Sequence, residues 1–100
     1  MAIIYHICYQ ADWQLARERG VYEAASLKEE GFIHCSQEEQ LEGVLQRYFK
    51  DKRGLVKLSI DTSLLQSRLI YEWSPSLTET FPHVYGPIQL QAVIETASIS

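Results

Sequence analysis

Three histidines are the residues of this 100-residue chain that are best suited to acid–base or ligand-binding chemistry. His6 lies near the end of an expected first strand, His34 lies two residues before an expected helix start, and His83 lies between two prolines. Imidazole changes its charge near neutral pH, so it can act as a general acid or base. A single histidine is more often a hydrogen-bonded structural residue than a catalyst. The shared position of all three beside strand ends and turns favours one common site.

Glu72 is the carboxylate that we expect to assist these histidines. It lies between Tyr71 and Trp73 in an apolar and aromatic run that is typical of a strand. Aromatic neighbours that exclude water would raise the pKa of the carboxyl group and prepare Glu72 to act as a general base. The alternative is an ordinary carboxylate that points outward from its strand.

A zinc site made from the three histidines is conceivable, because three protein ligands and one water are typical of catalytic zinc. The sequence contains no HxH or HxxxH pair, however, and side-chain alternation along a strand directs His34 and Cys35 to opposite faces. We therefore expect no metal. Cys8 and Cys35 lack CxxC spacing and are expected to be buried, reduced thiols.

Five segments have the composition or the alternation of β-strands, and they separate the candidate residues along the chain. The first two hold His6 and His34, and the fourth holds Glu72. The third alternates apolar with polar side chains, which predicts a solvent-exposed face that includes Ser59 and Asp61. The five segments are residues 3–8, 31–36, 55–61, 69–73 and 90–96.

Two main helices are expected between these strands. Asp12 can cap a helix over residues 13–19, which Gly20 can end in the left-handed conformation. Ser36 and Glu39 have the spacing of a capping box, in which each side chain accepts a backbone N–H, at the start of a longer helix. The apolar face that this second helix should add to the core consists of Leu41, Val44, Leu45, Tyr48 and Phe49.

Residues 74–87 are rich in serine, proline and threonine, and they predict a long loop that holds His83 and Tyr85. Strands and helices follow one another without a regular βαβ order. The sequence therefore predicts one α+β domain over residues 1–100, with a twisted, mostly antiparallel, split sheet of about five to six strands.

Composition limits the classes of function. The chain has nine lysines and arginines against thirteen acidic residues, a net charge of -4. It therefore lacks the basic field that non-specific nucleic-acid binding and attraction to anionic membranes require. No apolar run approaches the roughly 18 to 20 residues of a membrane-spanning helix. We expect a cytoplasmic protein, because the sequence shows neither a signal-peptide pattern nor a disulfide framework; its oligomeric state is left open.

Several motifs follow one another along nearly the whole chain. They are Ile4-Tyr5-His6, Trp13, Gly20, Tyr22, the segment 30–36 (EGFIHCS) and the segment 81–87 (FPHVYGP). Their order resembles the family known as domain of unknown function 952. The first half is also similar to the catalytic lobe of RNA 2'-phosphotransferases, in the ADP-ribosyltransferase superfamily.

The second resemblance implies an ADP-ribosyltransferase-like fold and a nucleotide-type small-molecule ligand. His6 and His34 would line a cleft for the ribose and diphosphate of NAD or of an ADP-ribosyl group. Glu72, or the segment with His83 and Tyr85, would supply the third site element. The expected catalytic residues are His34, Glu72 and His83, and the expected NAD-binding residues are His6, Ser36, Tyr85 and Trp13.

Three functional hypotheses stay open at this point. The first is an ADP-ribosyltransferase-like domain that acts at the N-glycosidic carbon of NAD, with histidine donors and one carboxylate stabilising an oxocarbenium-like centre. The second is a phosphoesterase in which His34 and His83 act as acid and base. The third is a non-catalytic ligand- or protein-binding module, in which residues 81–87 form an ordered contact patch.

Overall fold

The strands form three small antiparallel sheets in a computed structural model that describes residues 2–99. One sheet has the order β1-β4-β8, the second pairs β2 with β7, and the third has the order β3-β6-β5. The strands are β1 (Ile3–Tyr9), β2 (Val21–Tyr22), β3 (Ile33–His34), β4 (Leu55–Asp61), β5 (Arg68–Ser74), β6 (Glu79–Tyr85), β7 (Ile88–Gln89) and β8 (Val93–Ile99).

Three α-helices and three single-turn 3₁₀ helices connect the strands. The helices are α1 (Gln10–Arg19), α2 (Ala25–Glu30), α3 (Leu41–Tyr48), η1 (Glu38–Gln40), η2 (Thr62–Leu64) and η3 (Leu90–Ala92). The predicted single-domain α+β class with antiparallel sheets is confirmed, whereas the ADP-ribosyltransferase-like assignment stays a prediction. No helix within residues 2–99 is long and apolar enough to cross a membrane.

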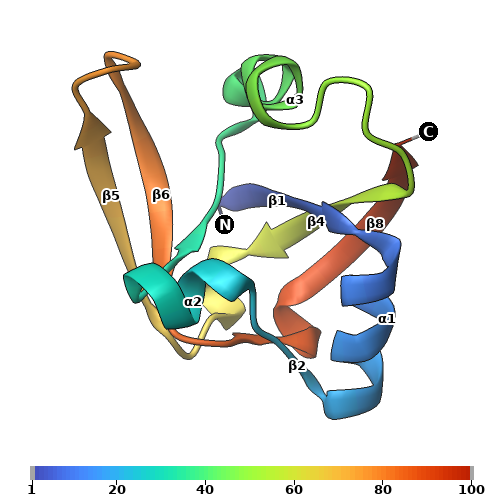
Figure 1. Ribbon diagram of the computed structural model, residues 1–100. Helices are drawn as coiled ribbons and strands as arrows, with labels where there is room; N and C mark the ends of the chain where they lie inside the picture. Colours follow the sequence, from blue (N-terminus) through green and yellow to red (C-terminus); the bar gives the residue numbers. More distant parts are fainter. Residues whose placement is uncertain (1, 100) are drawn as a thin grey trace.

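The split between the sheets is closed at one point by the backbone. The N–H of Tyr5 donates to the carbonyl of Ser36 at 2.8 Å, and the N–H of Ser36 donates to the carbonyl of Tyr5 at 2.7 Å. This pair of hydrogen bonds joins the edge of β1 to the chain that leaves β3. Figure 1 shows the resulting arrangement, in which the β5–β6 hairpin stands apart from the β1-β4-β8 sheet and α3 lies above β1.

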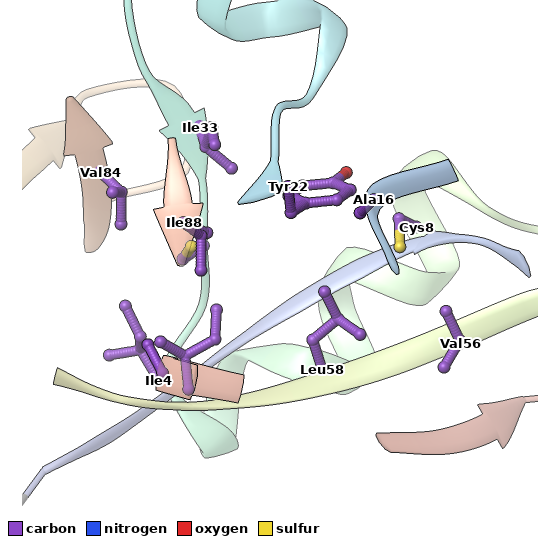
Figure 2. Packing of buried hydrophobic residues seen from close by; sticks show 12 residues of the cluster. Ile4, Cys8, Ala16, Tyr22, Ile33, Val56, Leu58, Val84 and Ile88 are labelled. Carbon is purple, nitrogen blue, oxygen red and sulfur yellow. The ribbon is translucent and has the colours of Figure 1, made fainter. Parts of the chain in front are cut away.

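The hydrophobic core lies on the inner face of the β1-β4-β8 sheet. Ile4 and Leu58 from this sheet pack in one buried cluster with Tyr22 of β2, Ile33 of β3 and Ile88 of β7 (Figure 2). Leu58 and Ile33 are completely buried. Cys8 and Cys35 are free and buried, so the sequence prediction for both thiols is confirmed.

The expected loop over residues 74–87 is wrong. Residues 79–85 form β6, the central strand of its sheet, and only the hairpin turn and the segment after β6 are irregular. Pro82 misled the prediction because a central strand rarely contains proline. In an antiparallel strand the backbone N and O of one residue point toward the same neighbouring strand. The Pro82 carbonyl accepts a hydrogen bond from the N–H of Cys35, which lies just beyond the end of β3. The missing N–H of Pro82 therefore faces the point where β3 has ended.

The start of the second main helix also differs from the prediction. The capping box is formed by Gln37 and Gln40 rather than by Ser36 and Glu39. Ser36 is instead committed to the backbone pair with Tyr5. The amide groups of Gln37 and Gln40 both donate to the Thr80 carbonyl, at 3.2 and 2.8 Å, and so fix the start of α3 against β6.

The predicted solvent-exposed face of β4 is wrong for two of its three polar residues, since only Lys57 stays partly exposed. Ser59 and Asp61 are buried, and Asp61 accepts hydrogen bonds from the N–H and hydroxyl of Ser63. The first helix begins earlier than predicted, at Gln10, so Asp12 lies inside its first turn and does not cap it.

The predicted strands at 3–8, 55–61 and 69–73 are confirmed almost to the residue, but the other two are not. The expected strand over 31–36 shrinks to Ile33–His34, because the chain then turns to meet β1. The last strand begins only at Val93, because residues 90–92 form η3.

Truncation of Leu58 should test the packing of the core. We expect Leu58→Ala to lower the free energy of unfolding by about 2 to 5 kcal/mol, because its side chain is fully buried in the central strand. The measurement is urea unfolding followed by circular dichroism. Leu15→Ala is the matched control, because Leu15 is 43% exposed on a helix, and it should change stability much less. Equal losses for both variants would contradict this assignment of the core.

Candidate functional site

The three histidines surround one cleft. Its volume is about 650 Å³, and its walls come from β1, α2, β3, α3 and the β5–β6 hairpin. In Figure 1 the segment that leads from β3 up to α3 runs beside this hairpin. The lining residues are His6, Ile7, Ser26, Glu30, His34, Cys35, Ser36, Val44, Tyr48, Phe49, Trp73, Ser74, Pro75, Leu77, Phe81 and His83.

His34 and His83 form a direct pair within the cleft. They are register partners across β3 and β6, so their side chains leave the same face of the sheet. Their rings meet edge to face with centroids 5.3 Å apart, and the Phe32 ring stacks on His83 at 4.1 Å. The His34 side chain is 54% exposed and that of His83 is 15% exposed, so solvent reaches the first far more than the second.

Each of these two histidines has a carboxylate partner. Glu30 Oε2 lies 3.1 Å from Nε2 of His34, and Glu72 Oε1 lies 2.7 Å from Nδ1 of His83. A carboxylate on one ring nitrogen fixes the orientation of the imidazole and stabilises its charged form. The other nitrogens, Nδ1 of His34 and Nε2 of His83, make no hydrogen bond to any residue between 2 and 99. They are the nitrogens that a ligand can use.

Glu72 is an ionised orienting group rather than a general base with a raised pKa. The Tyr85 hydroxyl and then Nδ1 of His83 donate to the same Glu72 oxygen, and these hydrogen bonds lower the pKa of the carboxyl group. The rise expected from Tyr71 and Trp73 is wrong. The pKa of Tyr85 is raised by the same hydrogen bond, which requires the phenol to keep its proton.

His6 is built into the floor of the cleft. Its Nδ1–H donates to the His34 carbonyl at 2.6 Å, and the Tyr22 hydroxyl donates to its Nε2 at 2.7 Å. A carbonyl can only accept, so this contact requires a proton on Nδ1, and in the neutral ring Nε2 is then the acceptor. Burial lowers the pKa of His6 to about 4. In this arrangement His6 connects β1 to β3, and both of its nitrogens are occupied.

The remaining walls of the cleft are mostly apolar. The predicted core face of α3 supplies Val44, Tyr48 and Phe49 to the cleft, and Tyr48 is 60% exposed. That face was expected to be part of the core, and this expectation is wrong because no residue of α3 is buried and none belongs to the core cluster. Trp73, 61% exposed, lies opposite on the hairpin. No lysine or arginine is found among the lining residues that the structure describes.

The other expected site residues lie at different distances from the cleft. Ser36 lines it, but its backbone is paired with Tyr5. Glu72 and Tyr85 do not line it and act on it through His83. Trp13 lies on α1 and packs against the hydrophobic core, away from the lining residues.

Several site residues were missed by the sequence argument. Tyr22 belongs to one of the recognised motifs, but nothing in its spacing indicates that it reaches His6. Glu30 lies four positions before His34, and a helical reading of that spacing could have indicated the contact. Phe32 shares a strand face with His34, so alternation alone could have placed it beside the site. Within residues 2–99 no cluster of three metal-binding side chains is present.

The fold and the cleft define a small α+β domain with a histidine-lined cleft. The chain belongs to the family described as Protein of unknown function (DUF952), whose sequence profile matches residues 7–96. The resemblance to this family is thus confirmed, whereas the resemblance to RNA 2'-phosphotransferases stays a prediction. No curated protein matches the chain.

The structure is similar to solved structures of protein CC0527 from Caulobacter crescentus. The X-ray structure is 31% identical in sequence, with a TM-score of 0.89, and the match covers 98% of this chain and 86% of that one. A double mutant of CC0527, also solved by X-ray crystallography, matches at 30% identity with a TM-score of 0.89 and the same coverage. The solution NMR structure matches at 32% identity with a TM-score of 0.84, over 100% of this chain and 86% of that one.

The buried state of His6 predicts a loss of stability in mild acid. The unfolded ring binds a proton below about pH 6.5, whereas the folded ring stays neutral down to about pH 4. The stabilising contribution is therefore complete above pH 6.5 and is lost as the pH falls toward 4. We expect the free energy of unfolding to fall by up to about 3 kcal/mol in this window.

Urea unfolding at a series of pH values measures this loss. His6→Gln is the matched control, because glutamine keeps a donor and an acceptor but does not titrate, and its stability should change less across the same window. An NMR titration of the His6 ring with a midpoint near pH 6.5 would show instead that the ring is accessible and titrates normally.

Proposed function

We propose that the cleft binds NAD or a related ADP-ribosyl ligand, and that His34 and His83 act on it at the N-glycosidic bond. The observation that carries the proposal is the meeting of three histidines, from β1, β3 and β6, around one cleft with aromatic walls. A volume of about 650 Å³ lies within the range of about 300 to 1,000 Å³ that is usual for small-molecule sites.

The charge of the residues lining the cleft favours the nicotinamide end of NAD over the diphosphate. The nicotinamide ring is a planar cation, and such rings favour aromatic faces and nearby carboxylates. Tyr48 and Trp73 supply aromatic surfaces, and Glu30 supplies a carboxylate in the lining. The diphosphate finds no lysine or arginine among the described lining residues, so it would depend on histidine and backbone donors. NAD⁺ should therefore bind more tightly than ADP-ribose.

The proposed reaction is hydrolysis or transfer at C1' of the nicotinamide ribose. The bond between C1' and the nicotinamide nitrogen breaks, and nicotinamide leaves with the bonding electron pair. Water, or the hydroxyl of an acceptor, forms the new C1'–O bond and gives its proton to Nε2 of His83. The ionised Glu72 stabilises the resulting imidazolium through Nδ1, and the proton then passes to solvent beside the exposed His34.

Binding of NAD⁺ is the first test. We expect millimolar NAD⁺ to raise the unfolding temperature, because a ligand at about 100 times its Kd stabilises the folded state by about 2.7 kcal/mol. His34→Ala and His83→Ala should each weaken NAD⁺ binding about tenfold or more in calorimetry, since each removes a polar group facing the ligand. Gln14→Ala, on the exposed side of α1, is the control and should bind like the parent.

The thermal shift measures binding, and the release of nicotinamide from NAD⁺ measures chemistry. If the parent protein shows no thermal shift with NAD⁺ or with ADP-ribose, the proposal is wrong. If NAD⁺ binds but no nicotinamide is released, the non-catalytic ligand-binding hypothesis replaces the enzymatic one.

A second candidate function is favoured by the close His34–His83 pair. Two imidazoles with centroids 5.3 Å apart, each beside a carboxylate, can act as acid and base in the cleavage of a phosphodiester. A 2',3'-cyclic nucleotide is the probe. The hypothesis predicts a bell-shaped pH–rate profile that disappears in His34→Ala. Absence of hydrolysis by the parent protein between about pH 5 and pH 8 would exclude it.

A further inference from the structure

A second hollow lies on the other side of Phe49 from the histidine cleft. Its volume is about 560 Å³, and it is formed by the end of α3, the turn that follows and the ends of β4 and β8. Its apolar lining includes Leu45, Phe49, Leu55 and Ile99. Phe49 lines both hollows and packs edge to face against Tyr9 of β1, with ring centroids 6.2 Å apart.

Lys50, Lys52 and Arg53 supply the cationic lining of this hollow, which also includes Gln46 and the single carboxylate of Asp51. The turn brings them together because the chain reverses at Asp51 (φ 63°) and again at Gly54 (φ 70°). All three are exposed. Within the described residues none of them has a carboxylate within 4.0 Å, since the ion pairs found there are those of histidines.

This clustering contrasts with the charge of the whole chain. Five of its nine basic residues fall in the segment 47–57, which contains Asp51 as its single acidic residue, although the net charge of the chain is -4. A cationic group beside apolar surface, in an otherwise acidic molecule, focuses an anion on one place. The histidine cleft has the opposite character, with carboxylates and no lysine or arginine in its described lining.

We propose that the second hollow binds an organic anion, a ligand with a planar or apolar body and a phosphate or carboxylate group. The body packs against Phe49 and its apolar neighbours, and the anionic group pairs with Lys50, Lys52 and Arg53. Both parts are needed, because exposed cations alone hold a simple anion weakly in salt. This site is independent of the proposed NAD chemistry.

The competing explanation is that these cations only complement the negative end of α3. Basic residues beyond a helix C-terminus stabilise the helix dipole without binding a ligand. The chain offers a matched control for this effect. Arg17, Arg19 and Lys28 are exposed basic residues in the last turns of α1 and α2 and lie outside the hollow.

The test uses 1-naphthyl phosphate as the probe in an NMR titration of the full chain. We expect saturable shifts at the amides of residues 49–55 and of Ile99. The triple variant with Lys50, Lys52 and Arg53 each changed to Gln should lose about tenfold or more in affinity. The control variant with Arg17, Arg19 and Lys28 each changed to Gln should lose less than about twofold. Inorganic phosphate and 1-naphthol should each bind about tenfold more weakly than the probe.

Each contrary result overturns the proposal. Equal losses of affinity in the two triple variants would show that the probe responds only to the overall charge of the chain. Lower stability with unchanged affinity would show that the three cations act only on the dipole of α3. Shifts confined to the amides of His34 and His83 place the probe in the cleft instead. A single-stranded oligonucleotide that binds through the same residues more tightly than the probe would show that the partner is a nucleic acid. The amide shifts of the parent protein identify where the probe binds, even if the triple variant does not fold.

Discussion

Two short backbone hydrogen bonds between Tyr5 and Ser36 hold the two larger sheets together, and the site depends on them. This bridge fixes the register between β1 and the chain that leaves β3, while Ile4 and Ile33 pack the two strands into one core. The contact from His6 to the His34 carbonyl, one residue further along β1, extends the same junction with a side chain. Because His34 is in turn the register partner of His83, a single chain of contacts connects β1, β3 and β6. The relative placement of the three imidazoles follows from this chain.

The contacts that join β1 to β3 also explain why the three histidines have different roles. His6 is buried, is hydrogen-bonded to the Tyr22 hydroxyl and keeps one neutral tautomer. It therefore holds the backbone carbonyl of His34 in place. His34 and His83 stand on the exposed side of the junction, and each keeps one ring nitrogen for a ligand. Cys8 contributes to the same buried environment, where burial raises the pKa of its thiol to about 11 and keeps it protonated.

The fold was predictable from the sequence wherever the pattern is local. Alternation placed β4, apolar and aromatic composition placed β1 and β5, and the predicted left-handed glycine at the end of α1 is found at Gly20, with φ 92°. The errors occur where long-range contacts override local preference. Pro82 sits in a central strand because the neighbouring strand β3 ends there, and Asp61 is buried where η2 folds back on it and Ser63 donates to its carboxylate.

The site was predictable in part. The convergence of His6, His34 and His83 was expected, and all three line the cleft. The partners that tune them could not be predicted, because the contacts of Tyr22 with His6 and of Tyr85 with Glu72 depend on how separate elements pack. The helical period of α3 indicated an apolar face, but only the packing shows that much of this face borders the cleft rather than the core.

A crystal structure of the chain grown with NAD⁺ would decide whether the junction of the sheets builds a ligand site. We expect ligand density between α3 and the β5–β6 hairpin, with polar atoms within hydrogen-bond distance of Nδ1 of His34 or Nε2 of His83. Density only at other surfaces, or a cleft closed by its own side chains with His34 and His83 turned apart, would refute this role for the cleft.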